Sequence, residues 1–440
     1  MNVLDCKTMK RRDFLRLACL SAVGGTLSGC AANPVTGDSQ LMLMSRGQEI
    51  QIDRERSPHQ FSADLGVMQD RSLNRYLHST GRSLAVLSHR PDMPYSFRGV
   101  NAVYVNAYAF PGGSIALTRG ILLEMDNEAQ LAALLGHELA HVNARHTASH
   151  MSKGMLVSTL LAGAGLALQS RAGEYTRLFT SLGGMAAGAL LAGYSRDNER
   201  QADALGMKYL VQAGYSPEGM VKLQDMLRSL SKHQPSAIEL MFATHPMSEE
   251  RYASARRTAA STYRNHLGNP VHRERYLDQT APIRRLKPLI KGLQNGQKLM
   301  SRQNLPQAET AFRKALQHHS QDYAGLIMLA GCLMSQEKYG PAERLAQQAK
   351  NVYPQEARAR HILGVCRLAR KRYASALAAF QSYEQLLPGN PSNIFLQGLS
   401  FEGMQQIRQA AAQYSRFLQQ VQQGEQARYA YSRLKQWGYI

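Results

Sequence analysis

The last third of this 440-residue chain repeats itself with a period of 34 residues. A small residue recurs as Ala308, Ala342, Ala376 and Ala410, and four positions later stand Phe312, Ala346, Phe380 and Tyr414. A fixed period of this length predicts pairs of helices that each pack on the next pair, because one pair cannot bury its apolar face alone. The C-terminal part is therefore expected to be an all-α solenoid.

Further positions with the same period support tetratricopeptide repeats, whose spacing is 34 residues. Small residues that would let the paired helices approach are Gly296, Ala330, Gly364 and Gly398. The proline that ends a repeat is present as Pro354 and Pro388, whereas Ser320 and Gln422 replace it elsewhere. We predict four repeats over about residues 289–422 and then a capping helix through Tyr431 and Trp437. The alternative is an unrelated helical bundle. A solenoid offers a concave face for partners or substrates.

The motif His137-Glu138-Leu139-Ala140-His141 stands out in the first half of the chain. On a helix, two histidines four residues apart project from one face, so both can bind one Zn²⁺, and the glutamate between them can act as a general base. Asn127 is expected to cap this helix, with Gln130 as its capping-box partner, and the helix is expected to run from Glu128 to about Ser149. A core helix with two satisfied histidines is the alternative.

A second histidine pair, His146 and His150, follows on the same predicted helix. Because 100° separates successive residues, His146 would lie about half a turn from His137. No glutamate stands between these two histidines. We therefore interpret the pair as a solvent-facing patch.

A catalytic zinc site needs a third protein ligand and an open position. Glu199 and Asp203 are four residues apart on a helix that Ser195 can cap. One of these carboxylates could bind the metal while the other orients a ligand imidazole. An ordinary acidic helix start is an equally good interpretation of the spacing alone.

His245, in Thr244-His245-Pro246, is a third point of interest, because Pro246 stiffens the chain before a helix that Ser248 can cap. His245 could protonate or stabilise the oxyanion of the reaction. It could instead reach the zinc and displace the water, which would make an enzyme latent, or it could be a simple turn residue. Arg251, one turn into the helix, could pair with the oxyanion or with Asp203.

These segments together resemble the HExxH gluzincin metallopeptidase family that includes the HtpX heat-shock protease and the CaaX prenyl proteases. The matching segments are Asn106-Ala107-Tyr108-Ala109, Pro111-Gly112-Gly113, Asn127-Glu128-Ala129, the HELAH motif, Glu199 with Asp203, and Thr244-His245-Pro246. They span about residues 34 to 260. The resemblance implies an α+β zincin-like domain that hydrolyses peptide bonds with one Zn²⁺ per chain.

By this resemblance, the metal ligands are His137, His141 and Glu199, and Glu138 is the catalytic base. Asp203 would support a ligand from behind. His245 and Arg251 match a downstream motif and are candidate catalytic residues.

Together with the C-terminal repeats, the resemblance implies that this chain acts in periplasmic quality control. There the chain would degrade misfolded or misassembled outer-membrane proteins, aid their assembly, and dock outer-membrane assembly machinery through the repeats. The competing class is a repeat-based chaperone or scaffold with latent proteolysis. A non-catalytic, zinc-stabilised domain is a third reading, but a structural site normally closes its fourth position with Cys or His, and here only His245 could do so.

The first 30 residues form an expected export signal and are kept out of fold reasoning. Lys10-Arg11-Arg12-Asp13-Phe14-Leu15 looks like a twin-arginine signal, and Leu27-Ser28-Gly29-Cys30 resembles a lipobox. The chain would then be a lipoprotein anchored to the outer membrane by a lipid on Cys30. Met9 is a possible true start, and a plain signal peptide with a stray cysteine is the alternative.

The rest of the chain divides into three expected parts, namely a zinc metallopeptidase domain over 31–270, a linker over 271–288 marked by Pro282 and Pro288, and the repeats over 289–440. Apolar runs of 14 residues at 155–168 and 17 residues at 178–194 are shorter than a membrane span. We interpret them as a helical hairpin near the active site. Residues 102–108 and 114–118 are expected to form a β-hairpin whose edge could pair with an extended peptide.

The net charge and the cysteines of the chain give two further expectations. The formal charge of +20 would suit nucleic acid, but the export signal argues against that partner. The positive charge is better explained by anionic lipid head groups or acidic proteins as partners, or by a solvated basic surface with no specific role. Cys332 and Cys366 occupy equivalent places in neighbouring repeats. They are expected to be buried thiols, with a disulfide as the alternative in an oxidising compartment.

Overall fold

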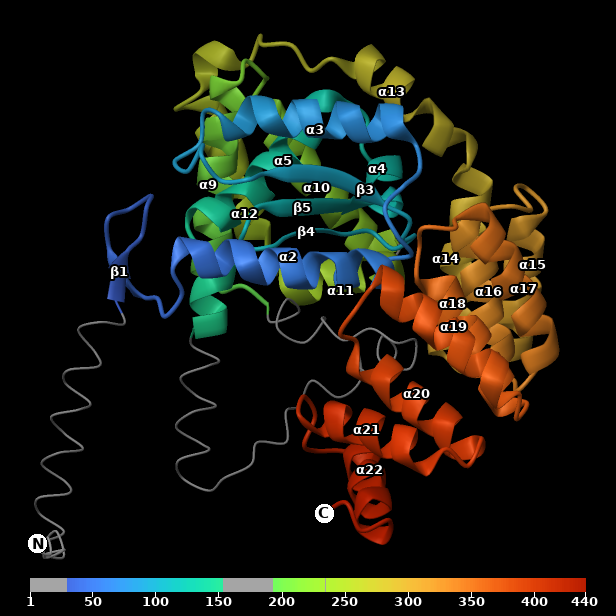
Figure 1. Ribbon diagram of the computed structural model, residues 1–440. Helices are drawn as coiled ribbons and strands as arrows, with labels where there is room; N and C mark the ends of the chain where they lie inside the picture. Colours follow the sequence, from blue (N-terminus) through green and yellow to red (C-terminus); the bar gives the residue numbers. More distant parts are fainter. Residues whose placement is uncertain (1–29, 153–192, 234) are drawn as a thin grey trace, which may run out of the picture.

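The computed structural model of the chain describes residues 30–152, 193–233 and 235–440. A small three-stranded sheet lies at the centre of the N-terminal region, with strand order β3-β5-β4 (Figure 1). Its strands are β3 (Ser96–Val100), β4 (Ala107–Ala109) and β5 (Ser114–Thr118). β3 pairs with β5 in parallel, and β4 pairs with β5 antiparallel. A separate two-stranded ribbon joins β1 (Cys30–Ala32) to β2 (Ser39–Leu41).

The expected β-hairpin is present as β4 and β5, but its first strand is shorter than predicted because residues 102–106 are not in a strand. The turn through Pro111-Gly112-Gly113 requires its glycines. Gly113 has a φ of +107°, and a Cβ on Gly112 would lie 2.5 Å from the Cβ of Asp53. β4 is an edge strand of this sheet.

Helices surround the sheet, with α3 along one side and α2 along the β4 side (Figure 1). The helices of this region are α2 (Arg46–Ala63), α3 (Arg71–Ala85), α4 (Arg119–Glu124), α5 (Glu128–Asn143), α9 (Arg196–Gln212), α10 (Glu218–His233), α11 (Pro235–Thr244) and α12 (Glu249–Ala260), followed by the 3-10 turn η1 (Arg264–His266). Every residue of α5 is buried. α5 and α9 pack where Gly136 faces Gly206, since a Cβ on Gly136 would lie 2.9 Å from the Gly206 carbonyl oxygen. The two helices that carry the sequence motifs are therefore in direct contact.

The segment 271–288, expected as a linker, is mostly the helix α13 (Arg273–Arg285). Tyr276 is fully buried and donates a hydrogen bond of 2.6 Å to the carbonyl of Leu122. Arg275 forms an ion pair with the buried Glu128. The connecting segment is therefore largely helical, and it packs against the N-terminal region.

The C-terminal region is a stack of helix pairs, as the 34-residue period predicts. The pairs are α14 (Lys287–Ser301) with α15 (Leu305–Leu316), α16 (Tyr323–Ser335) with α17 (Tyr339–Val352), α18 (Arg358–Ala369) with α19 (Tyr373–Leu386), and α20 (Pro391–Gly403) with α21 (Ile407–Leu418), and α22 (Glu425–Gln436) follows. The period-related glycines and aromatics meet within each pair. A Cβ on Gly296, Gly364 or Gly398 would lie 2.3–2.5 Å from a ring carbon of Phe312, Phe380 or Tyr414, respectively.

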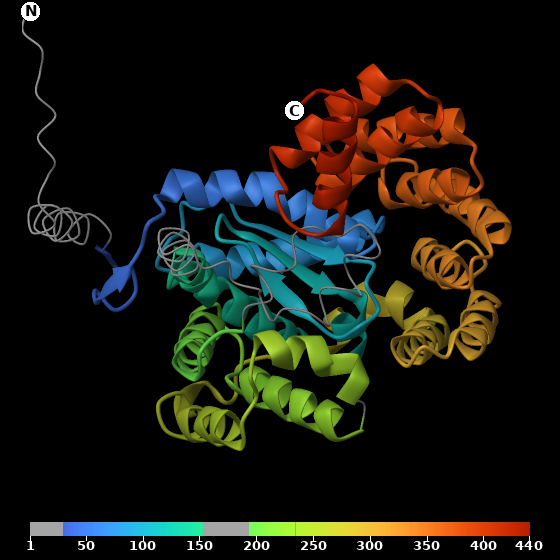
Figure 2. The ribbon, with the colours of Figure 1, turned by 90° about the horizontal axis from the view of Figure 1, so that it is seen from below.

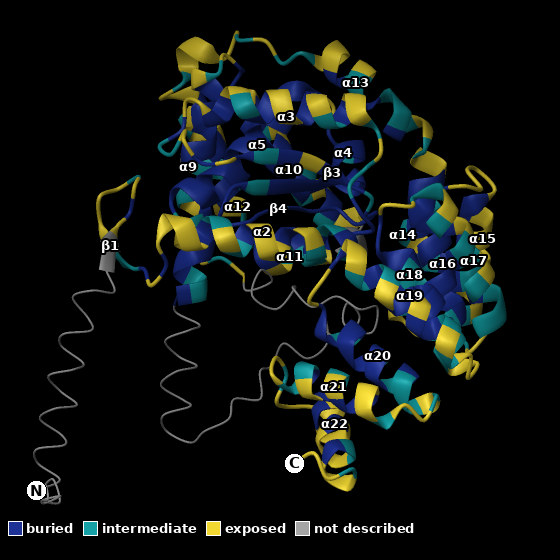
Figure 3. Ribbon diagram, viewed as in Figure 1, coloured by how far each residue is buried: buried dark blue, intermediate teal, exposed yellow. Residues whose placement is uncertain are grey.

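The stack of repeats curves around one side of the N-terminal region, as the view from below shows (Figure 2). Figure 3 shows buried residues along α14 and α16. The Arg119 guanidinium makes two hydrogen bonds, of 2.7 and 3.0 Å, to the carboxylate of Asp322, and both side chains are buried. Gln294 donates to the carbonyl of Val103 at 2.6 Å. Part of the inner face of the solenoid is thus occupied by the chain's own first half.

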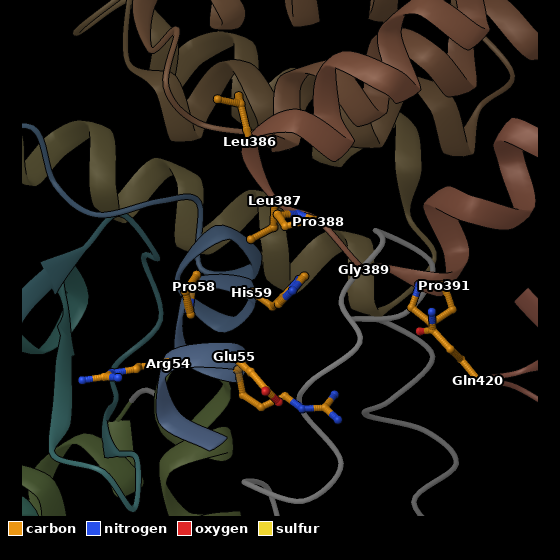
Figure 4. A pocket seen from close by; sticks show the side chains of 11 residues that line it. Arg54, Glu55, Pro58, His59, Leu386, Leu387, Pro388, Gly389, Pro391 and Gln420 are labelled. Atoms are coloured by element: carbon orange, nitrogen blue, oxygen red, sulfur yellow. The ribbon is translucent and has the colours of Figure 1, made fainter. Parts of the chain in front are cut away.

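Between α2 and the turn that joins α19 to α20, the two regions leave a hollow of about 740 Å³ (Figure 4). Arg54, Glu55 and His59 line it from α2, and Leu387 and Pro388 line it from the repeats. None of the motif residues named above contributes to this hollow.

Three further expectations concern the two cysteines of the repeats, the export signal and the two apolar runs. Cys332 and Cys366 are free and buried, as predicted. The export signal up to residue 29 and nearly all of the two apolar runs lie outside the described residues. Within the part of the chain that the structure describes, no helix is both long and apolar enough to cross a membrane.

Candidate metal centre

The motif histidines project from α5, whose start follows the sequence prediction. Asn127 caps the helix by accepting a hydrogen bond of 2.9 Å from the Gln130 amide. The Gln130 side chain accepts from the Asp126 amide at 2.7 Å rather than from Asn127. The helix ends at Asn143, not near Ser149 as expected. Arg145 adopts a φ of +59°, a conformation that breaks a helix, and helical structure resumes at His146.

Four side chains converge into one buried cluster, namely His137, His141, Glu199 and His245. The two motif histidines come from α5, Glu199 from the first turn of α9, and His245 from the residue after α11. Their nearest atoms are His137 Nε2 to His141 Nε2 at 3.1 Å, His141 Nε2 to Glu199 Oε1 at 3.3 Å, Glu199 Oε1 to His245 Nδ1 at 3.1 Å, and His245 Nδ1 to His137 Nε2 at 3.4 Å.

One donor atom from each of the four side chains lies within 4.8 Å of the other three. The four shorter separations are close to the roughly 3.3–3.4 Å that separates the ligand atoms of a tetrahedral zinc site with bonds of about 2.0–2.1 Å. The donors are three imidazoles and one carboxylate, which is a set that zinc prefers. The residues therefore fit one zinc ion, and His245 stands at the fourth corner.

His137 is held from behind by Asp203. Its Nδ1 lies 3.0 Å from Asp203 Oδ1, so the ring donates there and leaves the Nε2 lone pair facing the cluster. Arg251 in turn donates two hydrogen bonds of 2.7 Å to the same carboxylate. Burial acts to raise the pKa of Asp203, but the Arg251 charge outweighs it and lowers the pKa. The carboxylate therefore stays ionised behind the histidine.

His141 is supported by a residue that the sequence interpretation placed in solvent. His141 Nδ1 lies 2.9 Å from His146 Nδ1, and His146 Nε2 lies 2.8 Å from the Gln201 side-chain oxygen. The chain of donors that fits these contacts leaves His141 Nε2 free to bind a metal. His146 is 2% exposed, and burial lowers its pKa to about 4. The prediction of a solvent-facing patch is thus wrong for His146, because the break after Asn143 turns it back toward His141.

Glu138 lies beside the cluster without a hydrogen-bond partner. Neither carboxylate oxygen is hydrogen bonded to any described residue, although the side chain is fully buried. Burial raises the pKa of Glu138, and His245 Nε2 lies 3.8 Å from its Oε1. Buried polar groups are rarely left unpaired. This carboxylate is therefore available to a bound water or substrate.

Arg251 is already committed to carboxylates. Besides Asp203, its Nη1 lies 2.7 Å from Glu199 Oε2. Burial acts to raise the pKa of Glu199, but the neighbouring His245 and His137 lower it well below its ordinary value. The sequence left two partners open for Arg251, the oxyanion and Asp203. In the structure, Arg251 is paired with Asp203.

Tyr194 also contributes to the site, although no sequence pattern selects it. Its ring stacks on His141, with centroids 3.8 Å apart and planes inclined by 21°. Its hydroxyl lies 2.8 Å from the Thr147 hydroxyl. Tyr194 and His146 thus fix the orientation of His141, and only their proximity in the fold reveals it.

The comparisons with known proteins agree with both halves of this description. Residues 71–259 match the profile of peptidase family M48, and residues 299–366 match a tetratricopeptide-repeat profile. The chain therefore carries a peptidase family M48 domain followed by tetratricopeptide repeats, as the sequence motifs predict.

Curated relatives align mainly over the first half. The beta-barrel assembly-enhancing protease of Escherichia coli K12 is 29% identical over 231 residues, which are 51% of this chain and 47% of that protein. A putative beta-barrel assembly-enhancing protease of Vibrio cholerae is 32% identical over 202 residues, 44% of this chain and 40% of that protein. Metalloprotease YcaL of E. coli K12 is 33% identical over 169 residues, 38% of this chain and 63% of that protein. The chain thus spans about half the length of the first of these relatives.

Proposed function

We propose that this chain is a zinc metalloendopeptidase that cleaves unfolded or misassembled outer-membrane proteins in the periplasm. The observation that carries the proposal is the juxtaposition of four metal donors with the buried, unpartnered carboxylate of Glu138. The M48 match supports the peptide-bond chemistry. The names of the relatives support the class of substrate.

When bound, zinc supplies Lewis-acid chemistry by polarising the scissile carbonyl and lowering the pKa of water. His137, His141 and Glu199 would hold the ion, with Asp203 and His146 fixing the two rings. Glu138 would take the proton of the attacking water and pass it to the leaving amine. Its carboxylate is buried and has no hydrogen-bond partner among the described residues, so it is available for this role.

His245 would keep the resting site closed. Its Nδ1 lies 3.1 Å from Glu199 Oε1 and 3.4 Å from His137 Nε2, which is the place of a fourth ligand. A catalytic zinc keeps one position open. We therefore expect His245→Ala to raise hydrolysis. Lower hydrolysis would favour the other role, in which His245 stabilises the oxyanion.

The edge strand β4 is the part of the sheet that an extended substrate could join. Backbone pairing of this kind does not depend on side-chain sequence, which suits an enzyme that accepts unfolded chains.

The first experiment compares cleavage of an unfolded model protein by the zinc-loaded chain and by its Glu138→Gln variant. A general base contributes roughly 10²–10⁴-fold to rate, so the variant is expected to lose at least about 100-fold. Equal activity in the two proteins, both insensitive to a zinc chelator, would overturn the proposal.

The location and partners are further parts of the proposal. The twin-arginine-like segment and the lipobox at Cys30 suggest export and a lipid anchor in the outer membrane. The repeats are the expected contact with outer-membrane assembly machinery. Labelling of Cys30 by a radioactive fatty acid, compared with Cys30→Ser, tests the anchor. Unchanged levels of outer-membrane proteins in a strain without the gene would argue against the substrate class.

A chaperone or scaffold role is the second candidate, favoured by the occupation of the fourth corner by His245, which implies low resting activity. The Glu138→Gln variant separates the two roles in cells. A protease loses its function with that change, whereas a scaffold keeps it.

A further inference from the structure

A second built site lies away from the metal cluster, where the inner face of the repeats meets the N-terminal region. A hollow of about 100 Å³ is bounded there by the end of α2, the segment 102–104 and helices α14, α16 and α18. Most of its lining is apolar, including Leu65, Ala102, Ile327 and Met328. None of the cluster residues lines it.

Arg358, the first residue of α18, is the charged group in this lining. Its side chain is only 5% exposed, yet no hydrogen bond or ion pair to the guanidinium is formed by any described residue, and its Nε is buried without a partner. Burial lowers the pKa of Arg358, although a guanidinium keeps its charge in proteins. A buried charge without a partner is costly.

The two carboxylates that act on Arg358 electrostatically have other partners. Glu356 accepts hydrogen bonds from the hydroxyls of Ser62 and Tyr323, and from the backbone amide, not the guanidinium, of Arg358. Asp64 accepts from Tyr104, Tyr108 and Gln60. Glu356 and Asp64 thus have hydrogen-bond donors of their own, and the Arg358 guanidinium is available to bind an anion from outside the chain.

The volume of the hollow decides between ligands that carry both a carboxylate and an apolar group. About 100 Å³ is less than the roughly 150 Å³ cavity that holds a benzene molecule. It is large enough for one aliphatic side chain and too small for a long acyl chain. Gln297, partly exposed at the rim, makes no side-chain hydrogen bond to another described residue and can donate to a carboxylate.

We propose that this hollow binds the C-terminal residue of a peptide, with the terminal carboxylate paired to Arg358 and one aliphatic side chain in the apolar lining. The site would let the repeats select chains by their free end. Its far wall, residues 102–104, leads within three residues into the edge strand β4. A chain end held there would lie beside the segment that feeds the proposed substrate strand.

The test uses the full chain with Glu138→Gln, so that binding is measured without cleavage. The probe is a fluorescein-labelled six-residue peptide of glycine and serine ending in leucine, titrated by fluorescence anisotropy as the free acid and as the C-terminal amide. A hydrogen bond to a charged group is stronger than one between neutral groups, so the free acid is expected to bind at least about tenfold more tightly than the amide.

Three variants make the result specific. Arg358→Gln should abolish the preference for the free acid. Ala63→Leu, which fills the hollow from the end of α2 and keeps the charge, should weaken binding of the free acid even if the first variant folds poorly. Arg360→Gln is the matched control, because it removes the same charge from the same turn of α18 but does not line the hollow.

Equal binding of acid and amide would overturn the inference, as would a preference that survives Arg358→Gln. Binding of myristate that depends on Arg358, without binding of the peptide acid, would assign the hollow to a lipid and would also overturn it. Because binding is scored in a protein without its base, failure here would leave the proposed hydrolysis untouched.

Discussion

Glu138 and Glu356 are two buried glutamates of one molecule with opposite surroundings. Both side chains are buried, and burial raises the pKa of both carboxyls. Glu138 has no hydrogen-bond partner among the described residues, whereas Glu356 accepts from Ser62, Tyr323 and a backbone amide. Glu138 stands beside the metal donors, and Glu356 joins the repeats to the N-terminal region.

Hydrogen bonding distinguishes a buried carboxylate that serves a reaction from one that serves the structure. A fully hydrogen-bonded buried carboxylate fixes the geometry of its surroundings. A buried carboxylate that is left bare costs stability, and such a cost is typical of functional sites. We therefore expect changes at the metal cluster to affect zinc and hydrolysis, and changes at the interface to affect stability.

The largest expected effect on stability comes from breaking the buried pair between Arg119 and Asp322. Removing one partner of such a pair costs about 3–5 kcal/mol, because the other charge stays buried. Arg119→Gln should therefore lower the free energy of unfolding by about this amount in urea titrations. The cleavage rate per folded molecule should stay close to that of the wild type.

Arg313→Gln is the control for that experiment, because Arg313 pairs with Glu309 at the surface and its side chain is 53% exposed. An exposed pair contributes less than about 1 kcal/mol. Equal losses in the two variants would mean that the interface between the two regions contributes no special stability.

A smaller effect is expected at the metal cluster, where Asp203 supports His137. Asp203→Asn weakens the support of His137 and leaves Arg251 without its charged partner. Loss of such a support typically lowers metal affinity about 10–100-fold, which competition with a chelating dye would measure. Asp197→Asn, on the same helix but with an 82% exposed side chain, should leave the affinity unchanged. Unchanged affinity in both variants would show that Asp203 has no role in zinc binding.

Glu356 itself should give a change that depends on pH. Its folded pKa is raised, so the stability that it contributes is full below its unfolded pKa and is lost as pH rises through the folded pKa. Glu356→Gln removes this titration. The variant should be less stable than the wild type by about 1 kcal/mol at acidic pH, and the difference should shrink as pH rises above about 4.5. A difference that is constant with pH in urea titrations would contradict this.

An effect of similarly small size is expected at the cap of α5. Asn127→Ala removes the acceptor for the Gln130 amide and should cost about 1 kcal/mol of stability. Zinc affinity should not change, because the cap lies almost three turns before His137. A loss of zinc binding at full folding would place the start of α5 among the determinants of the metal site.

Local patterns allowed much of this molecule to be predicted. The 34-residue period identified the glycines and aromatics that meet within each helix pair, and the spacing of the HELAH motif gave both histidines one face. His146 was misplaced because Arg145, an ordinary residue by sequence, adopts a left-handed conformation. The contacts of Glu356 and Arg119 join residues more than 200 positions apart, and no local pattern reports such pairs.

One paired measurement tests the comparison most directly: hydrolysis of an unfolded protein and thermal unfolding, both recorded for Glu138→Gln and Glu356→Gln beside the wild type. We predict that Glu138→Gln loses hydrolysis and keeps or gains thermal stability, because a bare carboxylate becomes a neutral amide. Glu356→Gln should keep hydrolysis per folded molecule and show the change in unfolding. Hydrolysis that survives Glu138→Gln, or that is lost equally in both variants, would contradict the account.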